Sequence, residues 1–169
     1  MTGLLLARHS GATTIITSSS DEKLKLARDK YGADHTVNYN TTPNWDEEVN
    51  KLTNGRGADI IFENGGAGTI EKSINCVARG GIVSVIGFLS PPKEMPDVAG
   101  LVLGKGCVVR GINVGAKSLT EDLVRFVCAK GLEMPVEKVF RFDEGQVQEA
   151  YKYLESGGHV GKVCVQIRE

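Results

Sequence analysis

The sequence lacks the cysteine spacing that identifies metal-bound or disulfide-bonded domains. Its four cysteines, Cys76, Cys107, Cys128 and Cys164, form neither a C-x-x-C motif nor a tight Cys/His cluster. Structural zinc sites and disulfide frameworks depend on such spacing. We therefore expect no bound metal, and we interpret Cys76, Cys107 and Cys164 as buried thiols in a reducing compartment.

Excess charge of one sign and long apolar runs are also lacking. The 20 Lys and Arg residues nearly cancel the 21 Asp and Glu residues, which gives no electrostatic reason to bind nucleic acid or an anionic membrane surface. No apolar run could span a membrane, and Met1–Ala7 is too short for a signal peptide. These features predict a cytoplasmic protein that takes a small-molecule ligand.

A strand, a polar turn and a helix are predicted over residues 12–33. Ala12–Thr17 is a β-branched, uncharged run typical of a strand buried on both faces. Ser18–Ser20 follow, and apolar residues then recur at helical spacing up to Gly32, a typical helix terminator. This is the repeating unit of doubly wound nucleotide-binding sheets.

Strands and helices alternate along the rest of the chain, without repeats or linkers. This alternation predicts an α/β fold and one domain over residues 1–169. The further strands are expected at Thr36–Tyr39, Ala58–Glu63, Gly81–Gly87, Cys107–Asn113, Val139–Phe142 and Val160–Ile167, and the further helices at Thr2–Ser10, Trp45–Leu52, Thr69–Ala78, Val98–Leu103, Leu119–Ala129 and Glu144–Leu154.

Five segments resemble, in order, the cofactor-binding half of the medium-chain dehydrogenase/reductase superfamily, which includes zinc-type alcohol dehydrogenases and quinone reductases. They are SSSDEKLKLARDKYGADHTVNY, GADIIFENGG, ARGGIVSVIG, VRGINVGAKSLTEDLVRF and GGHVGKVCVQI. The resemblance implies a Rossmann-like, doubly wound, mostly parallel sheet. The family's glycine-rich loop and zinc-bearing N-terminal domain find no match, so we expect a version of the fold that is truncated at its N-terminus.

The resemblance also implies an NADP(H) site after the first strand. In NADP-dependent members of the superfamily, polar residues and a nearby Lys hold the 2′-phosphate, and the matching residues here are Ser18, Ser19 and Lys23. Hydroxyl groups and one cation suit a phosphate, whereas NAD sites usually have an acidic residue there. Asp21 keeps NAD open, and the serines equally suit an ordinary helix N-cap.

Further cofactor contacts are expected where parallel strands end, because ligands of open α/β sheets bind at that edge. By analogy with the superfamily, these contacts come from Gly65, Gly66, Gly87, Phe88 and Asn113. Each glycine also fits a tight strand-to-helix turn that has no role in binding.

Catalytic candidates are few, because no Ser/His/Asp or Cys/His spacing stands out. Glu63 ends a buried strand, a position where a carboxyl group is a candidate acid or base, and Asn64 follows it. The alternative is a structural role for Glu63. His9, His35 and His159 are interpreted as surface, cap or structural residues.

The strand that normally lies between Ala12–Thr17 and Ala58–Glu63 is missing, so both would have unpaired backbone groups. We expect Val160–Ile167 to fill this gap, or two chains to exchange strands. The resemblance further implies a homodimer through the edge strand Val108–Gly115.

Three functions remain open. The first is a truncated oxidoreductase that transfers hydride with NADP(H) when a partner completes it. The second is a repurposed non-redox enzyme, an isomerase, cyclase or hydrolase, that uses the cleft at the strand ends. The third is a dimerising binding module without catalysis.

Overall fold

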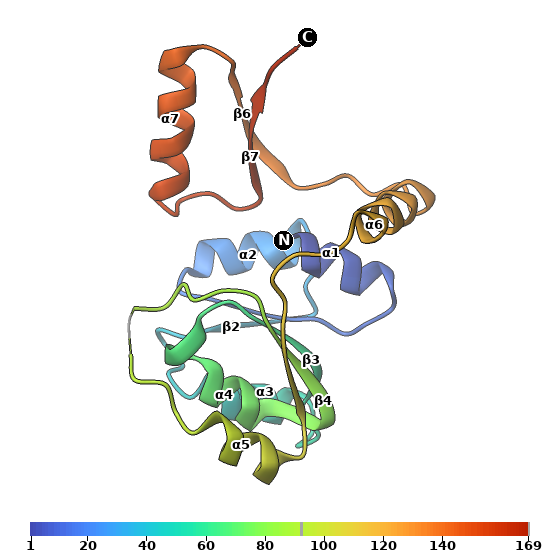
Figure 1. The fold of residues 1–169 in the computed structure, drawn as a ribbon, viewed down its shortest axis with the longest axis vertical. Coiled ribbons are helices and arrows are strands. Elements are labelled where there is room, and N and C mark those ends of the chain that lie inside the picture. Colours follow the sequence, from blue (N-terminus) through green and yellow to red (C-terminus); the bar gives the residue numbers. More distant parts are fainter. Residues whose placement is uncertain (92, 169) are drawn as a thin grey trace. The chain divides into compact units, whose positions relative to one another are not determined.

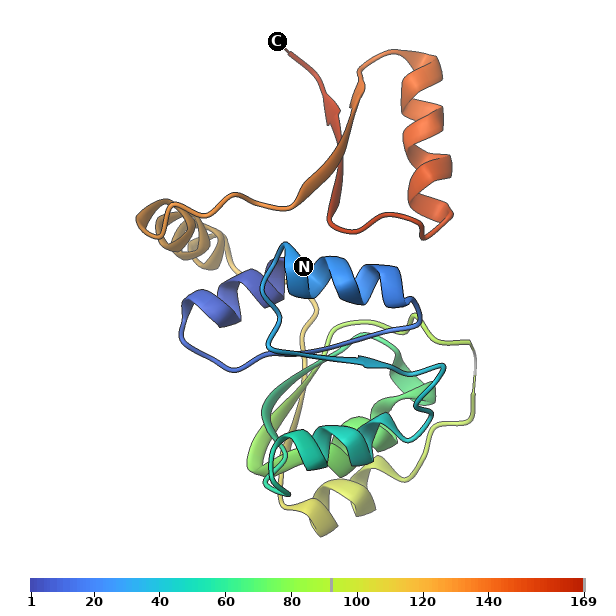
Figure 2. The same ribbon diagram turned by 180° about the vertical axis from the view of Figure 1, so that it is seen from behind.

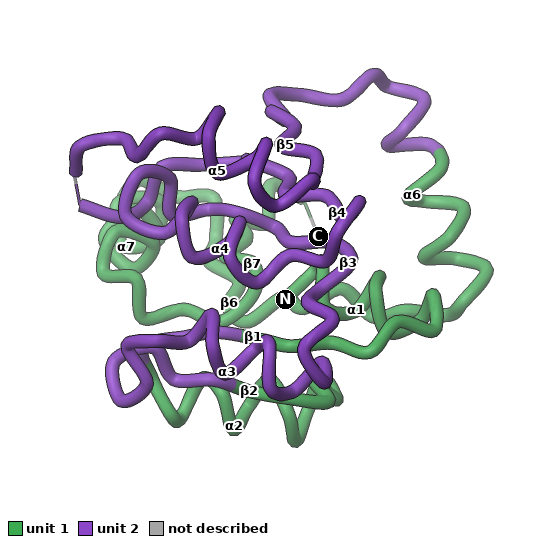
Figure 3. Tube along the Cα trace, turned by 90° about the horizontal axis from the view of Figure 1, so that it is seen from below, with its two compact units in different colours: residues 1–16, 20–36, 122–169 green, residues 17–19, 37–121 purple. Residues whose placement is uncertain are grey.

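The computed structural model describes residues 1–91 and 93–168, which form two compact units (Figure 3). The first unit contains residues 1–16, 20–36 and 122–169, and the second contains residues 17–19 and 37–121. The prediction of one domain over the whole chain stays a prediction.

The described residues alternate between strands and helices, which confirms the α/β fold class with parallel strands. The strands are β1 (Ile15–Ser18), β2 (His35–Asn38), β3 (Ala58–Glu63), β4 (Val77–Val85), β5 (Val108–Gly111), β6 (Val136–Arg141) and β7 (Lys162–Gln166). The helices are α1 (Thr2–His9), α2 (Asp21–Asp29), α3 (Trp45–Leu52), the short 3₁₀ turn η1 (Gly66–Gly68), α4 (Ile70–Cys76), α5 (Val98–Lys105), α6 (Lys117–Ala129) and α7 (Glu144–Glu155).

The second unit is built on the parallel sheet β3-β4-β5 (Figure 1). Its core is made by Ile70 and Ile74 of α4 with Val77 and Val83 of β4, and all four are almost fully buried. Partly buried residues of β3, β5 and α5 pack around this core. Residues on one face of the sheet therefore bury their side chains beneath α4 and α5.

The opposite face of this sheet carries exposed apolar side chains. Ile60 and Phe62 of β3 are 61% and 55% exposed, and Ile82, the register partner of Ile60 on β4, is 36% exposed. Successive strand residues point to opposite faces, so Ile61 lies against the core while its neighbours do not. The expected buried strand Ala58–Glu63 is therefore buried on one face only. The expectation that Ala12–Thr17 is a strand buried on both faces is wrong, because β1 begins at Ile15 and none of its residues is fully buried.

Strand β4 begins directly after α4, at Val77, and not at Gly81 as expected. Val77 has extended backbone angles and pairs with Ala58. A Cβ on Gly57, which has φ +86°, would lie 2.7 Å from the Val77 backbone. Only glycine permits this close approach, which brings Val77 into the sheet and ends the helix before Ala78.

The first unit has its own core, made by Leu4 and Leu5 of α1 with Ala27, Tyr31 and Ala33 from α2 and the residues after it. Further along the chain, β6 and β7 form a parallel pair, and α7 runs beside it (Figure 2). The βαβ order of β6, α7 and β7 explains the parallel direction of the two strands.

The expectation that the last strand replaces a missing central strand is wrong. Among the described strands, β7 pairs with β6 only, β1 pairs with β2, and β3 pairs with β4. Five residues of β7 have register partners on β6. A parallel partner joined to β7 by one helix is available within the same segment, so the chain needs no distant strand to pair it.

Thr14 and Asp34 link the segment before β1 to the segment before β2. The Asp34 carboxylate accepts hydrogen bonds from the Thr14 backbone N–H at 2.8 Å and from the Thr14 hydroxyl at 2.9 Å. The His35 N–H donates to the Thr14 carbonyl at 3.0 Å. The two Thr14 donors lower the pKa of Asp34, because they favour its charged form.

Replacing Asp34 should make the protein less stable in a pH-dependent way. A lowered folded-state pKa gives a stabilising contribution that is present above the unfolded pKa of about 3.9 and is lost as pH falls through the folded value. Asp34→Ala should therefore lower the unfolding midpoint at neutral pH, and its difference from wild type should shrink below about pH 3.9. Thermal unfolding measured across this range, with the exposed Asp29→Ala as control, checks this; a pH-independent difference would contradict it.

The cysteines should differ sharply in reactivity. Cys76 is 1% exposed, and the pKa of its thiol is raised to about 12. Burial is the main cause, and the negative charge of Asp46 adds to it. Cys107 and Cys164 are half-buried, so the expectation that they are buried is wrong, and Cys128 lies exposed on α6. Labelling with a thiol reagent should modify Cys128 first and Cys76 only after unfolding, because the thiolate is the reactive form. Cys128→Ser should abolish the fast phase, and a fast phase that persists would overturn this assignment.

Candidate cofactor and active site

The Glu63 carboxylate organises the turn that follows β3. It is 3% exposed, and its Oε1 accepts hydrogen bonds from the Gly65 N–H at 2.7 Å, the Gly66 N–H at 3.0 Å and the Thr69 hydroxyl at 2.5 Å. The Ser73 hydroxyl donates to Oε2. Four donors from the turn and from α4 therefore surround one buried carboxylate, as a buried charge requires.

Glycine is needed at Gly66 for two reasons. Its φ of +80° lies in the left-handed region, and a Cβ there would lie 2.4 Å from Cδ1 of Phe88. A residue with a side chain would therefore be strained and would displace the Phe88 ring. The ring is itself 70% exposed, so one edge of it contacts the turn while most of its surface faces solvent.

The loop after β4 is fastened to the turn after β3. The Ser90 hydroxyl donates to the Gly65 carbonyl at 2.6 Å and accepts from the Gly68 N–H at 3.2 Å. The Ser90 N–H also donates to the Gly65 carbonyl at 3.0 Å, and the Leu89 N–H donates to the Asn64 carbonyl at 2.8 Å. Residues 64–68 and 88–90 therefore form one hydrogen-bonded surface at the carboxyl ends of β3 and β4.

The hydrogen bonding of this surface limits what it can bind. The N–H groups of Gly65 and Gly66 are directed at Glu63, and that of Gly68 is directed at Ser90. Phosphate groups normally bind to free backbone N–H groups. With three of these donors used internally and a carboxylate beneath them, the surface suits an uncharged sugar or ring better than a phosphate.

The structure brings together most of the residues predicted at the strand ends. Glu63, Gly65, Gly66 and Phe88 are in contact through the interactions described above. A Cβ on Gly87 would lie 3.3 Å from the Asn64 carbonyl, so Gly87 also lies against this turn. Asn113 follows β5 at the same edge of the sheet and is exposed.

The three residues predicted to hold a 2′-phosphate follow one another along the chain. Ser18 ends β1, Ser19 is exposed, and Ser20 is the N-cap of α2, where its hydroxyl accepts from the Lys23 N–H at 3.3 Å. The Lys23 ammonium donates to the backbone carbonyls of Gly157 and His159. The capping role thus belongs to Ser20, and the Lys23 side chain is held by the turn before β7.

Sequence reasoning missed three hydroxyl residues of this site, Thr69, Ser73 and Ser90. A weak signal was present for two of them: Thr69 and Ser73 are four residues apart and lie on one face of a helix that starts just after the glycine turn. Ser90 gave no comparable signal, because its partners belong to a different loop.

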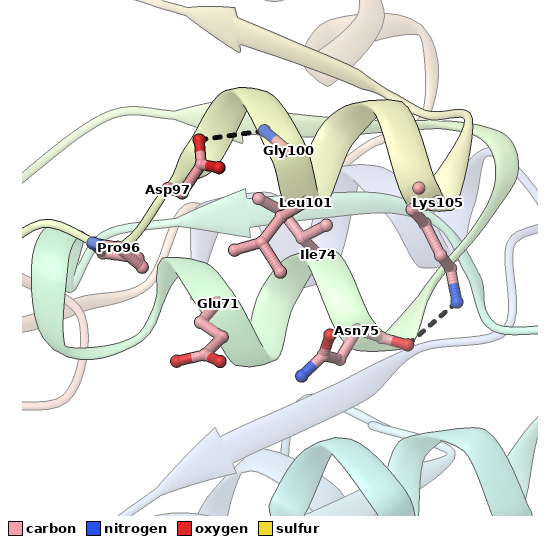
Figure 4. Close-up of a pocket in the computed structure, with 9 residues that line it drawn as sticks. Glu71, Ile74, Asn75, Pro96, Asp97, Gly100, Leu101 and Lys105 are labelled. Carbon is pink, nitrogen blue, oxygen red and sulfur yellow. Dashed lines mark hydrogen bonds between the residues drawn. The ribbon is translucent and has the colours of Figure 1, made fainter.

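A separate hollow of about 570 Å³ lies between α4 and α5 in the second unit (Figure 4). The carboxyl groups of Glu71 and Asp97 lie toward one end, and at the other end Lys105 donates to the Asn75 carbonyl at 2.9 Å. None of the predicted site residues lines this hollow.

The described part of the chain comprises residues 1–91 and 93–168. No group of three or more His, Cys, Asp or Glu side chains within these ranges could hold a metal ion. Within the same ranges, no helix combines the length and apolar character needed to cross a membrane.

The family model for zinc-binding dehydrogenases matches residues 1–129. The chain belongs to this family. It is 42% identical over 167 residues to a zinc-type alcohol dehydrogenase-like protein of Schizosaccharomyces pombe, and the match covers 97% of the chain and 47% of that relative. The chain thus spans about half the length of this relative.

Solved structures of this dehydrogenase family share the fold. An NAD-dependent alcohol dehydrogenase is 32% identical with a TM-score of 0.84, over 98% of this chain and 47% of its own. The quinone oxidoreductase of Thermus thermophilus, which was also solved with NADPH, is 25% identical with a TM-score of 0.78, over 98% of this chain and 53% of its own. These matches confirm the resemblance to the cofactor-binding half and its Rossmann-like fold.

Removing the Glu63 carboxylate should strongly destabilise the protein. Glu63→Ala would leave four donors without their acceptor in a buried site, which should cost about 3 kcal/mol of unfolding free energy. Urea unfolding measures this, with the exposed Glu71→Ala on α4 as the matched control. Equal stability of the two variants would show that the Glu63 network contributes nothing.

Proposed function

We propose that this chain is the dinucleotide-binding part of an NADP(H)-dependent oxidoreductase of the zinc-binding dehydrogenase family. When NADPH is bound, it supplies a hydride for reduction of a carbonyl or activated alkene group. The chain's own residues would bind and orient the dinucleotide. Because the chain spans about half of its relative, a partner or a further segment would supply the substrate contacts.

The capping role of Ser20 is the observation that carries this proposal. Because Ser20 accepts the hydrogen bond that caps α2, capping does not explain the two preceding serines. Ser18 and Ser19 follow β1, where acidic residues are usual in NAD sites, and hydroxyl groups suit a phosphate oxygen. Lys23, in the first turn of the same helix, would add the charge.

NADP is favoured over NAD by these side chains, whereas the solved relatives include both cofactor types. One solved relative is described as NAD-dependent, and another was solved with NADPH. The Ser18, Ser19 and Lys23 set favours the phosphorylated cofactor, because a cation and hydroxyl groups compensate a dianion.

A homodimer through the edge strand is part of the proposal. Among the described strands, β5 has one neighbour, β4, so one edge of it has no strand partner. Val108 on this strand is 50% exposed and Val114, beyond its end, is 86% exposed. An unpaired edge with apolar side chains suits pairing with a second copy of the chain.

Non-redox acid/base chemistry at Glu63 is supported less well. Both of its carboxylate oxygens accept hydrogen bonds from the protein, and the residue is 3% exposed. A general base must reach the proton that it removes. A structural role for Glu63 is therefore the better-supported alternative, and a catalytic role for Glu63 or Asn64 stays a prediction.

Cofactor titration by calorimetry tests the proposal. NADPH should bind in the micromolar range and more tightly than NADH, and Lys23→Ala should weaken NADPH by about tenfold, because a charge-assisted contact is lost. Ser19→Ala should weaken it less. Lys25→Ala, an exposed lysine of the same helix, and Ser118→Ala are the matched controls.

Two results would contradict the proposal. The absence of binding at millimolar NADPH would remove the dinucleotide altogether. If NADPH and NADH bind with equal affinity, and Lys23→Ala changes neither affinity, then the proposed 2′-phosphate site is wrong and the domain has no preference for NADP.

A further inference from the structure

The Ser90 hydroxyl joins the two turns at the strand ends, because it both donates and accepts a hydrogen bond. Its hydroxyl donates to Gly65 at 2.6 Å and accepts from Gly68 at 3.2 Å, so it contacts both ends of the glycine turn. It is partly buried. Pro91 follows it and restricts its backbone to extended conformations, which limits the freedom of the loop at this position.

The two ends of the glycine turn are held by different residues. Glu63 holds Gly65 and Gly66 from beneath, but the N–H of Gly68 is held by Ser90. Glycine-rich segments have the largest conformational entropy in the absence of such contacts. The shape of the turn therefore depends on a residue of the neighbouring loop.

Phe88 belongs to the same loop as Ser90 and lies against the glycine turn. Phe88 precedes Ser90 by two residues. Its ring lies against Gly66, and the residue is 70% exposed. An exposed aromatic ring held beside a glycine turn is a flat apolar surface on which a sugar or a planar ring can lie. The turn offers no N–H of Gly65, Gly66 or Gly68 to an anion, as described above.

From these contacts we infer that Ser90 is a positioning residue for the nicotinamide ring and its ribose, the part of the dinucleotide that adenosine 2′-monophosphate lacks. It fastens residues 64–68 to residues 88–90, so that the glycine turn and the Phe88 ring present one preformed surface. Preformed surfaces bind more tightly, because less conformational entropy is lost on binding. This inference rests on the proposed function.

The test compares two ligands, NADPH and adenosine 2′-monophosphate, on the 169-residue protein and its Ser90→Ala and Ser90→Thr variants. Adenosine 2′-monophosphate carries the phosphate that Ser18, Ser19 and Lys23 would hold but lacks the second ribose and the nicotinamide. Ser90→Ala should weaken NADPH by about tenfold and leave adenosine 2′-monophosphate unchanged. Ser90→Thr keeps the hydroxyl and should restore NADPH binding, and Ser118→Ala is the control.

Amide hydrogen exchange at Gly68 gives a readout that does not depend on the ligand. The Gly68 N–H loses its acceptor in Ser90→Ala, so its exchange should be faster by about tenfold, while exchange of the core strand residue Val83 stays unchanged. Unchanged exchange at Gly68 would overturn the inference that Ser90 fastens the glycine turn to the loop after β4.

The remaining outcomes separate this inference from the proposed function. Equal weakening of both ligands by Ser90→Ala would indicate general loss of structure and overturn a positioning role. Unchanged NADPH binding with faster Gly68 exchange would also overturn it. If the wild-type protein binds neither ligand, the proposed function fails, and the ligand assigned to Ser90 fails with it. Faster exchange at Gly68 in Ser90→Ala would still show that Ser90 holds the glycine turn.

Discussion

The buried carboxylate of Glu63 is the constraint on which the strand-end edge of the second unit depends. A charge at 3% exposure is stable only when donors surround it, and here all four come from the turn and the helix that follow β3. To supply them, the chain must turn sharply at Gly65 and Gly66 and begin α4 immediately afterwards. One side chain thus fixes the end of the strand, the path of the turn and the start of the helix.

This arrangement has a chemical consequence for ligand binding. Glycine turns at strand ends of nucleotide-binding sheets are usually regarded as sources of free N–H groups for phosphates. In this protein those of Gly65 and Gly66 are used by Glu63, and that of Gly68 by Ser90. The turn therefore offers none of these three N–H groups to a phosphate.

The sheet β3-β4-β5 has one exposed apolar face, and its strand β5 has one edge without a strand partner among the described strands. A parallel sheet normally has helices on both faces, yet α4 and α5 cover one face only, and Ile60 and Phe62 remain open to solvent. The chain spans about half of a relative from the same family. The second unit therefore carries apolar surface beyond what its own helices bury.

The sequence by itself determined the elements and the family. Apolar spacing and turn residues located the strand, serine turn and helix of residues 12–33, and the order of the remaining elements predicted the α/β fold. These signals are local: side-chain periodicity and backbone preferences act over a few residues, so a single sequence displays them. The glycine turn after Glu63 was visible for the same reason.

Only the tertiary structure decided which groups meet. It showed that Glu63 binds Thr69 and Ser73, that Ser90 holds the glycine turn, that the Lys23 ammonium contacts the carbonyls of Gly157 and His159, and that β7 pairs with β6. It also opened the face that carries Ile60 and Phe62. These outcomes depend on contacts between segments distant along the chain, and composition and periodicity carry no record of which donor reaches which acceptor.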